Sequence, residues 1–263
     1  MVFIRMRSAF GAGAPSVATF LTRRWTQPGG TLSGEIRLRG GDFDAAIDRI
    51  GLGLAARLGP LKAAGDRDGI EEFCRPQISG PAVLPQGAER AIEFRVAVPW
   101  ETPISEIGGR HLTGLALAVQ AEVAIDTAVG RGDAALVAVR PVPSQLRVLQ
   151  AFARLGFPFK SAALRAGPLS HVGQELPFHQ RIEFYPPSHH AGVVHAVELS
   201  FVPSASGLDV LLAAGKATGP CSGGERFRMS HEEALRTDWP SEIDRWLARL
   251  VRQARGDGRW HRG

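Results

Sequence analysis

The sequence contains little cysteine and no long apolar run, and both absences narrow what the protein can be. Its only cysteines, Cys74 and Cys221, lie in different halves and form no CxxC pair. We therefore expect free thiols in a reducing compartment. No apolar stretch reaches the length of a membrane span, and glycine and proline at residues 11–15 interrupt the apolar core that a signal peptide needs. The sequence thus predicts a cytoplasmic protein.

Tyrosine is also scarce, and this weighs against nucleic-acid binding. The chain has one tyrosine, and no run of arginine or lysine is interleaved with aromatic residues as a base-stacking surface requires. The formal charge of +5 and the pI of about 10.0 come from basic residues scattered beside Asp and Glu. We therefore expect solvated strand faces and no nucleic-acid partner.

The pattern that is present is that of an all-β chain. The 31 glycines and 18 prolines separate short apolar runs. Residues 31–39 and 91–98 alternate between apolar and polar side chains, which is typical of half-buried strands. Strands at this spacing favour β-sandwiches over βαβ units. We predict two β-sandwich domains, at residues 1–130 and 131–255, and a disordered tail at 256–263.

A short helix is expected near the junction of the two domains, within residues 141–160. Pro143 suits the first helical position, and Gly156 suits the position after a helix end where φ is positive. The expected apolar face consists of residues three and four apart with neighbours that widen it: Leu146, Leu149 and Ala153, with Val148, Phe152 and Leu155.

A second helix is expected from a cap at Ser241 to about residue 254. It is amphipathic, with an apolar face and an arginine face. Since most helical stability comes from packing, the first expectation is that the apolar face covers the second domain. The alternative is that the helix docks on a partner protein or, peripherally, on an anionic membrane. The candidate docking residues are Ile243, Arg245, Trp246, Leu247, Arg249, Leu250 and Arg252.

Three other patterns suggest chemistry, and each has a simpler explanation. Residues 51–56 match G-x-G-x-x-A but lack a βαβ context. Five of the eight histidines lie between His171 and His195 without a recognisable ligand spacing. Ser144 could join Asp126 and a histidine in a triad, but the chain has no G-x-S-x-G elbow, and a helix start explains Ser144 better. We therefore expect no catalytic residue, no cofactor and no metal.

Several stretches of the chain keep the order and spacing of a known family over roughly residues 15–215. They are QPGGTLSGEIRLRGG (27–41) followed by 47–57, VPWETPI (98–104), PVPSQLRVLQAFARLGF (141–157), FHQRIEFYPP (178–187) and VELSFVPSASGLDVLL (197–212). Together they resemble the sporulation-control proteins of the sporulation stage zero protein M type, whose fold is arrestin-like. One departure is that Gly130, Arg131, Ala163 and Arg165 stand where that family commonly has acidic residues. If those acids set the contact between the domains, the orientation of the domains differs here.

The resemblance implies two β-sandwich domains, no catalytic activity, no cofactor and a cytoplasmic role in sporulation or development through protein contacts. It transfers no site residue. We therefore expect a non-enzymatic adaptor whose partner the sequence does not name. Exposed strand edges would accept partner strands and also favour self-association. The alternative is a small-molecule or lipid binding module that uses the groove between the domains. An enzyme would need a cleft with perturbed titrating groups.

Overall fold

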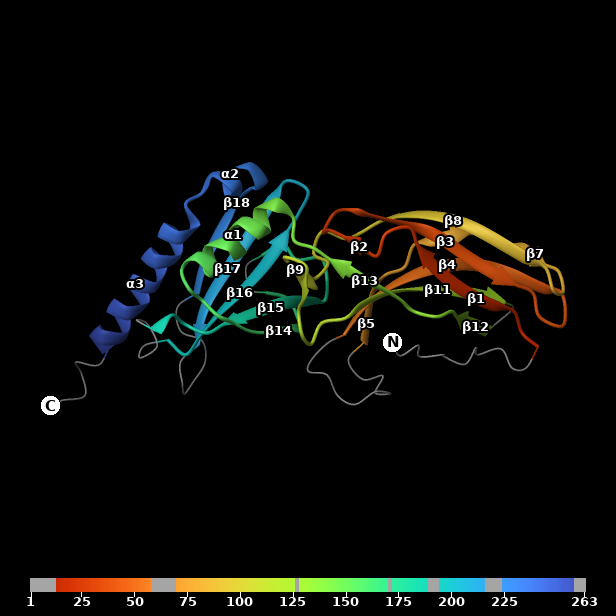
Figure 1. The fold of residues 1–263 in the computed structure, drawn as a ribbon, viewed down its shortest axis with the longest axis horizontal. Helices are drawn as coiled ribbons and strands as arrows, with labels where there is room; N and C mark the ends of the chain where they lie inside the picture. The colour runs from red at the N-terminus through yellow and green to blue at the C-terminus, as the bar shows by residue number, and fades with distance from the viewer. Residues whose placement is uncertain are drawn as a thin grey trace. The chain divides into compact units, whose positions relative to one another are not determined.

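The computed structural model describes residues 13–57, 70–125, 128–169, 172–188, 194–215 and 224–257. The chain divides into two compact units, which are described separately (Figure 1). Unit 1 comprises Met1–Glu106 and Leu115–Arg140, and unit 2 comprises Ile107–Gly114 and Pro141–Gly263. Most elements of both units are strands, which confirms the predicted all-β class.

Unit 1 is a sandwich of two sheets. One sheet has the order β1-β3-β8; the other has the order β2-β13-β11-β4-β5, with β6 and β7 paired to β4 and β12 paired to β11. Alternate side chains of β3, β4 and β11, among them Ile36, Ile50 and Val119, are fully buried and form the core. The strands are β1 (Ser16–Leu21), β2 (Trp25–Thr26), β3 (Thr31–Arg39), β4 (Ala45–Arg57), β5 (Ile70–Cys74), β6 (Gln77–Ser79), β7 (Ala82–Leu84), β8 (Glu89–Ala97), β11 (Leu117–Ile125), β12 (Ala128–Arg131) and β13 (Ala135–Val139).

The boundary between the units lies after Arg140 and not after residue 130 as the sequence analysis placed it. The reason is that β13, which follows residue 130, belongs to the sandwich of unit 1. It pairs antiparallel with β11 and parallel with β2, where Ala138 lies opposite Trp25. The Val139 N–H also donates a hydrogen bond of 2.9 Å to the Ser105 hydroxyl.

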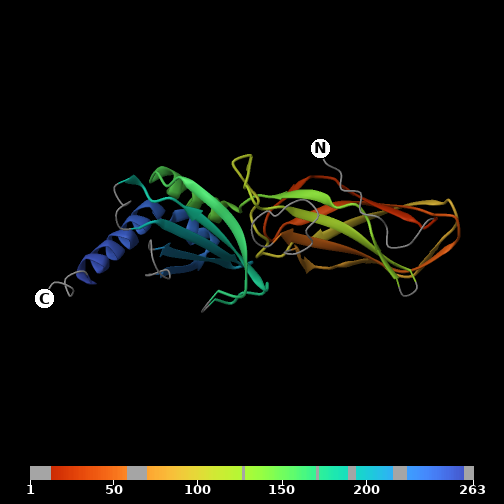
Figure 2. The ribbon, with the colours of Figure 1, turned by 90° about the horizontal axis from the view of Figure 1, so that it is seen from below.

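Unit 2 contains a five-stranded antiparallel sheet in the order β14-β15-β16-β17-β18. One face carries fully buried side chains, such as Ile182, Leu199 and Val210, and helices cover it (Figure 2). Its strands are β14 (Phe159–Ala166), β15 (Phe178–Phe184), β16 (Ala196–Pro203), β17 (Gly207–Gly215) and β18 (Gly224–Ser230); a separate two-stranded sheet pairs β9 (Glu106–Ile107) with β10 (Arg110–His111). Among the described residues, the second layer of this domain is therefore helical, where the sequence suggested another sheet.

The short helix predicted near the junction is confirmed as α1 (Pro143–Arg154). Pro143 is its first residue, and Gly156, with φ of 76°, lets the chain turn away after the last helical turn. The Phe157 N–H closes that turn with a 3.0 Å hydrogen bond to the Phe152 carbonyl.

The buried face of α1 differs in part from the predicted one. Leu149 is buried as expected, but Ala153 is exposed and Leu146 is half-buried. The face is instead centred on Val148 and Phe152, because the Phe152 ring stacks on Phe184 of β15 with 4.5 Å between the centroids. The choice of face thus depends on the strand that the helix meets.

The predictions for the C-terminal tail and for the two cysteines can be checked only in part. The last helix, α3 (Trp239–Asp257), includes residues 256 and 257, which were assigned to the tail; residues 258–263 lie outside the described residues. Cys74 is a free thiol of β5, and burial raises the pKa of its thiol, whereas Cys221 lies outside the described residues.

Candidate functional site

The C-terminal helices begin directly after β18, and the sequence did not predict this junction. Directly after β18, the short helix α2 (His231–Arg236) starts with a reciprocal cap. The Glu233 N–H donates to the Ser230 hydroxyl at 3.2 Å, and the Ser230 N–H donates to the Glu233 carboxylate at 2.8 Å. The Ser230 N–H and the Ser230 hydroxyl both donate to the Glu233 carboxylate at 2.8 Å, and these two hydrogen bonds lower the pKa of Glu233. The cap fixes the direction in which the chain leaves the sheet.

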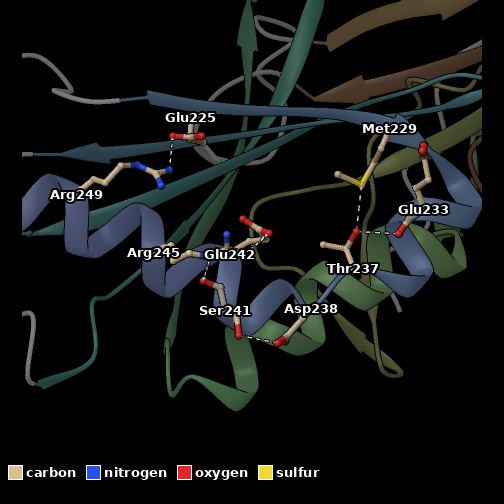
Figure 3. Close-up of polar contacts among 9 residues, drawn as sticks. All are labelled: Glu225, Met229, Glu233, Thr237, Asp238, Ser241, Glu242, Arg245 and Arg249. Carbon is tan, nitrogen blue, oxygen red and sulfur yellow. Dashed lines mark hydrogen bonds and ion pairs between the residues drawn. The ribbon is translucent and has the colours of Figure 1, made fainter.

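The cap of α3 is Asp238 and not Ser241, which corrects the prediction. Asp238 precedes the first helical residue, and its carboxylate accepts a 2.6 Å hydrogen bond from the Ser241 hydroxyl (Figure 3). This hydrogen bond is the main cause of a lowered pKa at Asp238. The Asp238 carbonyl also accepts the Glu242 N–H at 3.1 Å. Ser241 therefore lies inside the first turn and supports the cap.

The apolar face of α3 belongs to the core of unit 2. Ile243, Trp246 and Leu247 are at most 1% exposed, and Leu250 is 9% exposed. At the start of the helix, the indole N–H of Trp239 donates to the Ala234 carbonyl at 2.8 Å and its ring packs edge-on against Phe227 of β18. Four of the seven candidate docking residues are thus covered by the unit itself.

The arginine face of α3 is exposed, and two of its three members are in ion pairs. Arg245 pairs with Glu242 one turn earlier, and Arg249 reaches Glu225 of β18 at 2.7 Å (Figure 3). Arg252 is exposed. Solvated pairs of this kind contribute little stability and can be exchanged for other carboxylates. The arginine face is the part of the predicted docking helix that a partner can reach.

β18 is an edge strand of the five-stranded sheet. In the described part of the chain its one neighbour is β17, and no residue of β18 is buried. Arg226 and Arg228 project from the face opposite the core; Arg226 pairs with Asp209 at 2.9 Å, whereas Arg228 has no ion pair among the described residues. The edge therefore combines unpaired backbone with positive charge.

The open face of the same sheet carries a bridged pair of glutamates. Glu183 and Glu198 are direct neighbours on β15 and β16, and Arg181 contacts both, at 2.6 and 3.3 Å. Burial by itself raises the pKa of Glu183, but the hydrogen bond from Lys160 and the charge of Arg181 outweigh it, so that this pKa lies below its usual value. The bridge allows two like charges to share one sheet face.

Unit 1 has a corresponding bridge on its outer sheet face. Arg131 of β12 lies 3.2 Å from Glu72 of β5 and 2.6 Å from Glu122 of β11. Arg75 reaches the same Glu72 at 2.6 Å. Arg131, one of the residues that depart from the family pattern, thus serves the surface of unit 1.

Ser144 is brought to a histidine, but in a structural setting. Its hydroxyl lies 2.7 Å from Nδ1 of His231, and Nε2 of that ring lies 2.9 Å from the Ser204 carbonyl. Because a carbonyl can only accept, Nε2 carries a proton, and in the neutral ring Nδ1 then accepts a hydrogen bond from the Ser144 hydroxyl. Ser144 is 1% exposed, so its hydroxyl is closed off from a substrate. The contact ties α1, α2 and the β16–β17 turn together.

The described residues contain no group of three or more His, Cys, Asp or Glu side chains that could hold a metal ion. His179 lies in β15, and its Nδ1 is 2.9 Å from the Gly167 carbonyl. His171, His189 and His190 lie outside the described residues. Within the same part of the chain, no helix combines the length and the apolar composition needed to cross a membrane.

Comparison with known proteins identifies the family. The model of the SpoOM protein family matches residues 3–218. This chain belongs to the SpoOM protein family. The crystal structure of Spo0M, a sporulation control protein from Bacillus subtilis, superposes with a TM-score of 0.77 at 23% identity and covers 90% of this chain and 99% of its own. This likeness confirms the fold. No curated protein sequence matches the chain.

A second solved structure illustrates how far other similarities fall below the SpoOM match. The alkylpurine DNA glycosylase AlkC of Pseudomonas fluorescens has a TM-score of 0.29 at 14% identity and covers 49% of this chain and 31% of its own. A score at this level carries no argument about fold or function. The family match therefore places the chain among sporulation-control proteins.

Proposed function

We propose that this member of the SpoOM family is a non-enzymatic, cytoplasmic adaptor that binds protein partners through arrestin-like sheet surfaces. The observation that supports this best is the open edge of β18, where exposed backbone lies beside Arg226 and Arg228. Unpaired N–H and C=O groups of an edge strand bind an extended peptide by backbone pairing, and the flanking side chains select its sequence.

The charges on β18 favour an acidic partner strand over a second copy of this chain. In a two-fold antiparallel pairing centred on residue 226, 227 or 228, an arginine always lies opposite an arginine. Like charges directly opposite one another destabilise a strand pair. A partner strand with Asp or Glu at alternate positions would instead place its carboxylates beside Arg226 and Arg228 on one face of the sheet. Its intervening residues would lie beside Phe227 on the other face.

The arginine face of α3 adjoins this edge, because Arg249 binds Glu225 of β18. An acidic partner would compete with Glu225 for Arg249 and reach Arg252 beyond it. The predicted docking role of α3 is therefore retained for Arg245, Arg249 and Arg252, while the buried apolar face serves the fold.

The proposal is tested by affinity purification from the native cell. The bait is full-length protein, and the variants are Arg226→Glu with Arg228→Glu, and Arg245→Glu with Arg249→Glu and Arg252→Glu. The matched control for the β18 variant is Arg49→Glu with Arg90→Glu, which changes two exposed arginines of unit 1 and so alters the net charge by the same amount.

A partner retained by the control and lost from the β18 variant supports the proposed site. A partner lost only from the α3 variant moves the contact to the helix. Equal retention of the same partners by all four proteins would disprove an interaction at either surface. Circular dichroism and unfolding midpoints must match the unchanged protein in every variant, since a misfolded bait would also lose its partner.

A further inference from the structure

Unit 1 contains a cleft where the chain crosses from one of its sheets to the other. β1 pairs with β3 up to Leu21 opposite Gly34, and the last bond is donated by the Thr22 N–H to the Ser33 carbonyl at 2.9 Å. The chain then leaves this sheet and joins the other one, where Trp25 pairs with β13. The first residues of β3 therefore extend past the end of β1, and a cavity of about 510 Å³ opens beside them.

The side chains that line this cleft carry positive charge and hydroxyl groups. Arg23 and Arg95 contribute guanidinium groups, Thr22, Thr31 and Ser33 contribute hydroxyls, and none of the lining residues is acidic. Arg95 projects from the same face of the sheet as Ser33, which is directly opposite. In the described part of the chain, neither guanidinium has a carboxylate partner. Both cations are thus available to a ligand.

One wall of the cleft is fixed by the rest of unit 1. The guanidinium of Arg140 lies over the ring of Trp25, 4.6 Å from its centroid, and Arg140 is itself held by Glu106 at 2.6 Å. Arg23 lies 5.8 Å from the same centroid. Trp25 is 37% exposed, so part of the ring remains open. A ligand would meet a prearranged aromatic and cationic wall, which lowers the ordering cost of binding.

We propose that this cleft binds the phosphate group of an organic phosphate. Guanidinium groups pair with phosphate through two parallel N–H donors, and a phosphate has enough oxygens to accept from Arg23, Arg95 and the hydroxyls together. The open volume beside Trp25 leaves room for the organic part. A neighbouring hollow shares Thr22 and Ser33 but is also lined by Glu35 and Glu93, whose carboxylates would repel a phosphate, so that the ligand's phosphate is expected on the Arg95 side.

The test uses full-length protein and three probes: inorganic phosphate, glycerol 3-phosphate, and phosphatidylcholine vesicles with and without phosphatidylglycerol. The soluble probes are titrated while the Trp25 indole resonance is followed by NMR, and vesicle binding is measured by sedimentation. We expect Arg95→Gln to weaken binding about tenfold, since a charge-assisted hydrogen bond contributes on the order of one to two factors of ten. Arg90→Gln, an exposed arginine on the same strand but outside the cleft, should bind as the unchanged protein does.

Binding of glycerol 3-phosphate that Arg95→Gln weakens supports the proposal with a free metabolite as the source. Binding confined to phosphatidylglycerol vesicles, and weakened by the same change, supports it with a lipid headgroup as the source. Absence of binding to all probes at millimolar phosphate, or equal binding by Arg95→Gln, would overturn it. Arg23→Gln provides a second variant in case Arg95→Gln unfolds. Because these residues belong to unit 1 and β18 belongs to unit 2, failure here leaves the adaptor proposal standing.

Discussion

The two units bury their sheets in different ways. In unit 1 the layers are both sheets, and small and medium side chains such as Ile36, Ile50 and Val119 fill the space between them. In unit 2 the opposite layer is helical, and the fully buried side chains include Phe152 and Trp246. Sheet-on-sheet packing spreads the core over many strands, whereas helix-on-sheet packing concentrates it in a few large residues. Single substitutions in the core should therefore lower the free energy of unfolding more in unit 2 than in unit 1.

The largest effect is expected from Phe152→Ala. This ring stacks on Phe184 and lies 5.0 Å from the Phe157 ring, so that its removal leaves a cavity in unit 2. The free energy of unfolding should fall by about 3–5 kcal/mol. Hydrogen exchange measured by mass spectrometry should show faster amide exchange in peptides of unit 2. The control is Phe43→Ala, a 51% exposed residue of unit 1, which should change stability by less than about 0.5 kcal/mol. Equal losses in the two variants would contradict the packing role assigned to Phe152.

The arginine bridges allow a closer comparison, because each unit has one. Arg181→Ala leaves Glu183 and Glu198 facing each other, with Lys160 still paired to Glu183. Arg131→Ala removes the link between Glu72 and Glu122, with Arg75 still paired to Glu72. The Arg181 side chain is 25% exposed and that of Arg131 is 46% exposed. Since burial strengthens such pairs, we expect losses of about 2 kcal/mol for Arg181→Ala and about 1 kcal/mol for Arg131→Ala in urea unfolding.

The control for both bridges is Arg236→Ala, which removes a fully solvated pair with Glu232 and should cost less than about 0.5 kcal/mol. If Arg131→Ala lowered the free energy of unfolding more than Arg181→Ala, the larger effect of substitutions in unit 2 would hold only for its apolar core.

A smaller effect is expected at the start of α3, the layer that unit 1 lacks. Asp238→Ala should lower the unfolding temperature of unit 2, because the carboxylate caps the helix. Ser241→Ala keeps that carboxylate and should cost less. Thermal unfolding of both variants at neutral pH compares them directly. If Ser241→Ala lowered the stability as much as Asp238→Ala or more, Ser241 would be the cap, as the sequence predicted.

The smallest effect is a pH dependence confined to unit 2. The pKa of Glu183 is lower in the folded protein than in the unfolded chain, so the stabilisation from its charged form is complete above about pH 4.3, the usual glutamate value. It is lost as the pH falls through the lower folded pKa. The free energy of unfolding, measured in urea from pH 7 to pH 3, should therefore decline less steeply for Glu183→Gln than for the unchanged protein. Identical slopes would show that Glu183 contributes nothing to acid sensitivity.

Local chemistry made some elements predictable. Pro143 and Gly156 mark the two ends of α1, and the alternation in β3 and β8 is visible in the sequence because one face of each is buried. Helix α2 was missed, although Ser230 followed by Glu233 is a capping-box signal. β5 and β6 were not predicted, because short strands that pair along β4 show little alternation of their own.

Packing and topology could not be predicted in this way. The amphipathic pattern of α3 was correct, but the pattern is the same whether Trp246 and Leu247 pack on their own unit or on a partner. The cleft in unit 1 is a further case. Arg23 and Arg95 are far apart in the sequence, and only the crossing of the chain from one sheet to the other brings them together. No local motif marks such a site.

Helix α3 follows all the described strands of unit 2 in the sequence, and this order has a consequence for synthesis in the cell. Unit 1 has all its strands once the ribosome has passed β13, whereas unit 2 must await Leu250 to close its core. At typical elongation rates the interval is roughly 5 to 20 s. During that time the growing chain carries a finished domain followed by strands whose apolar face is uncovered. A chaperone that engages nascent chains would therefore be expected to act on the second half of this protein.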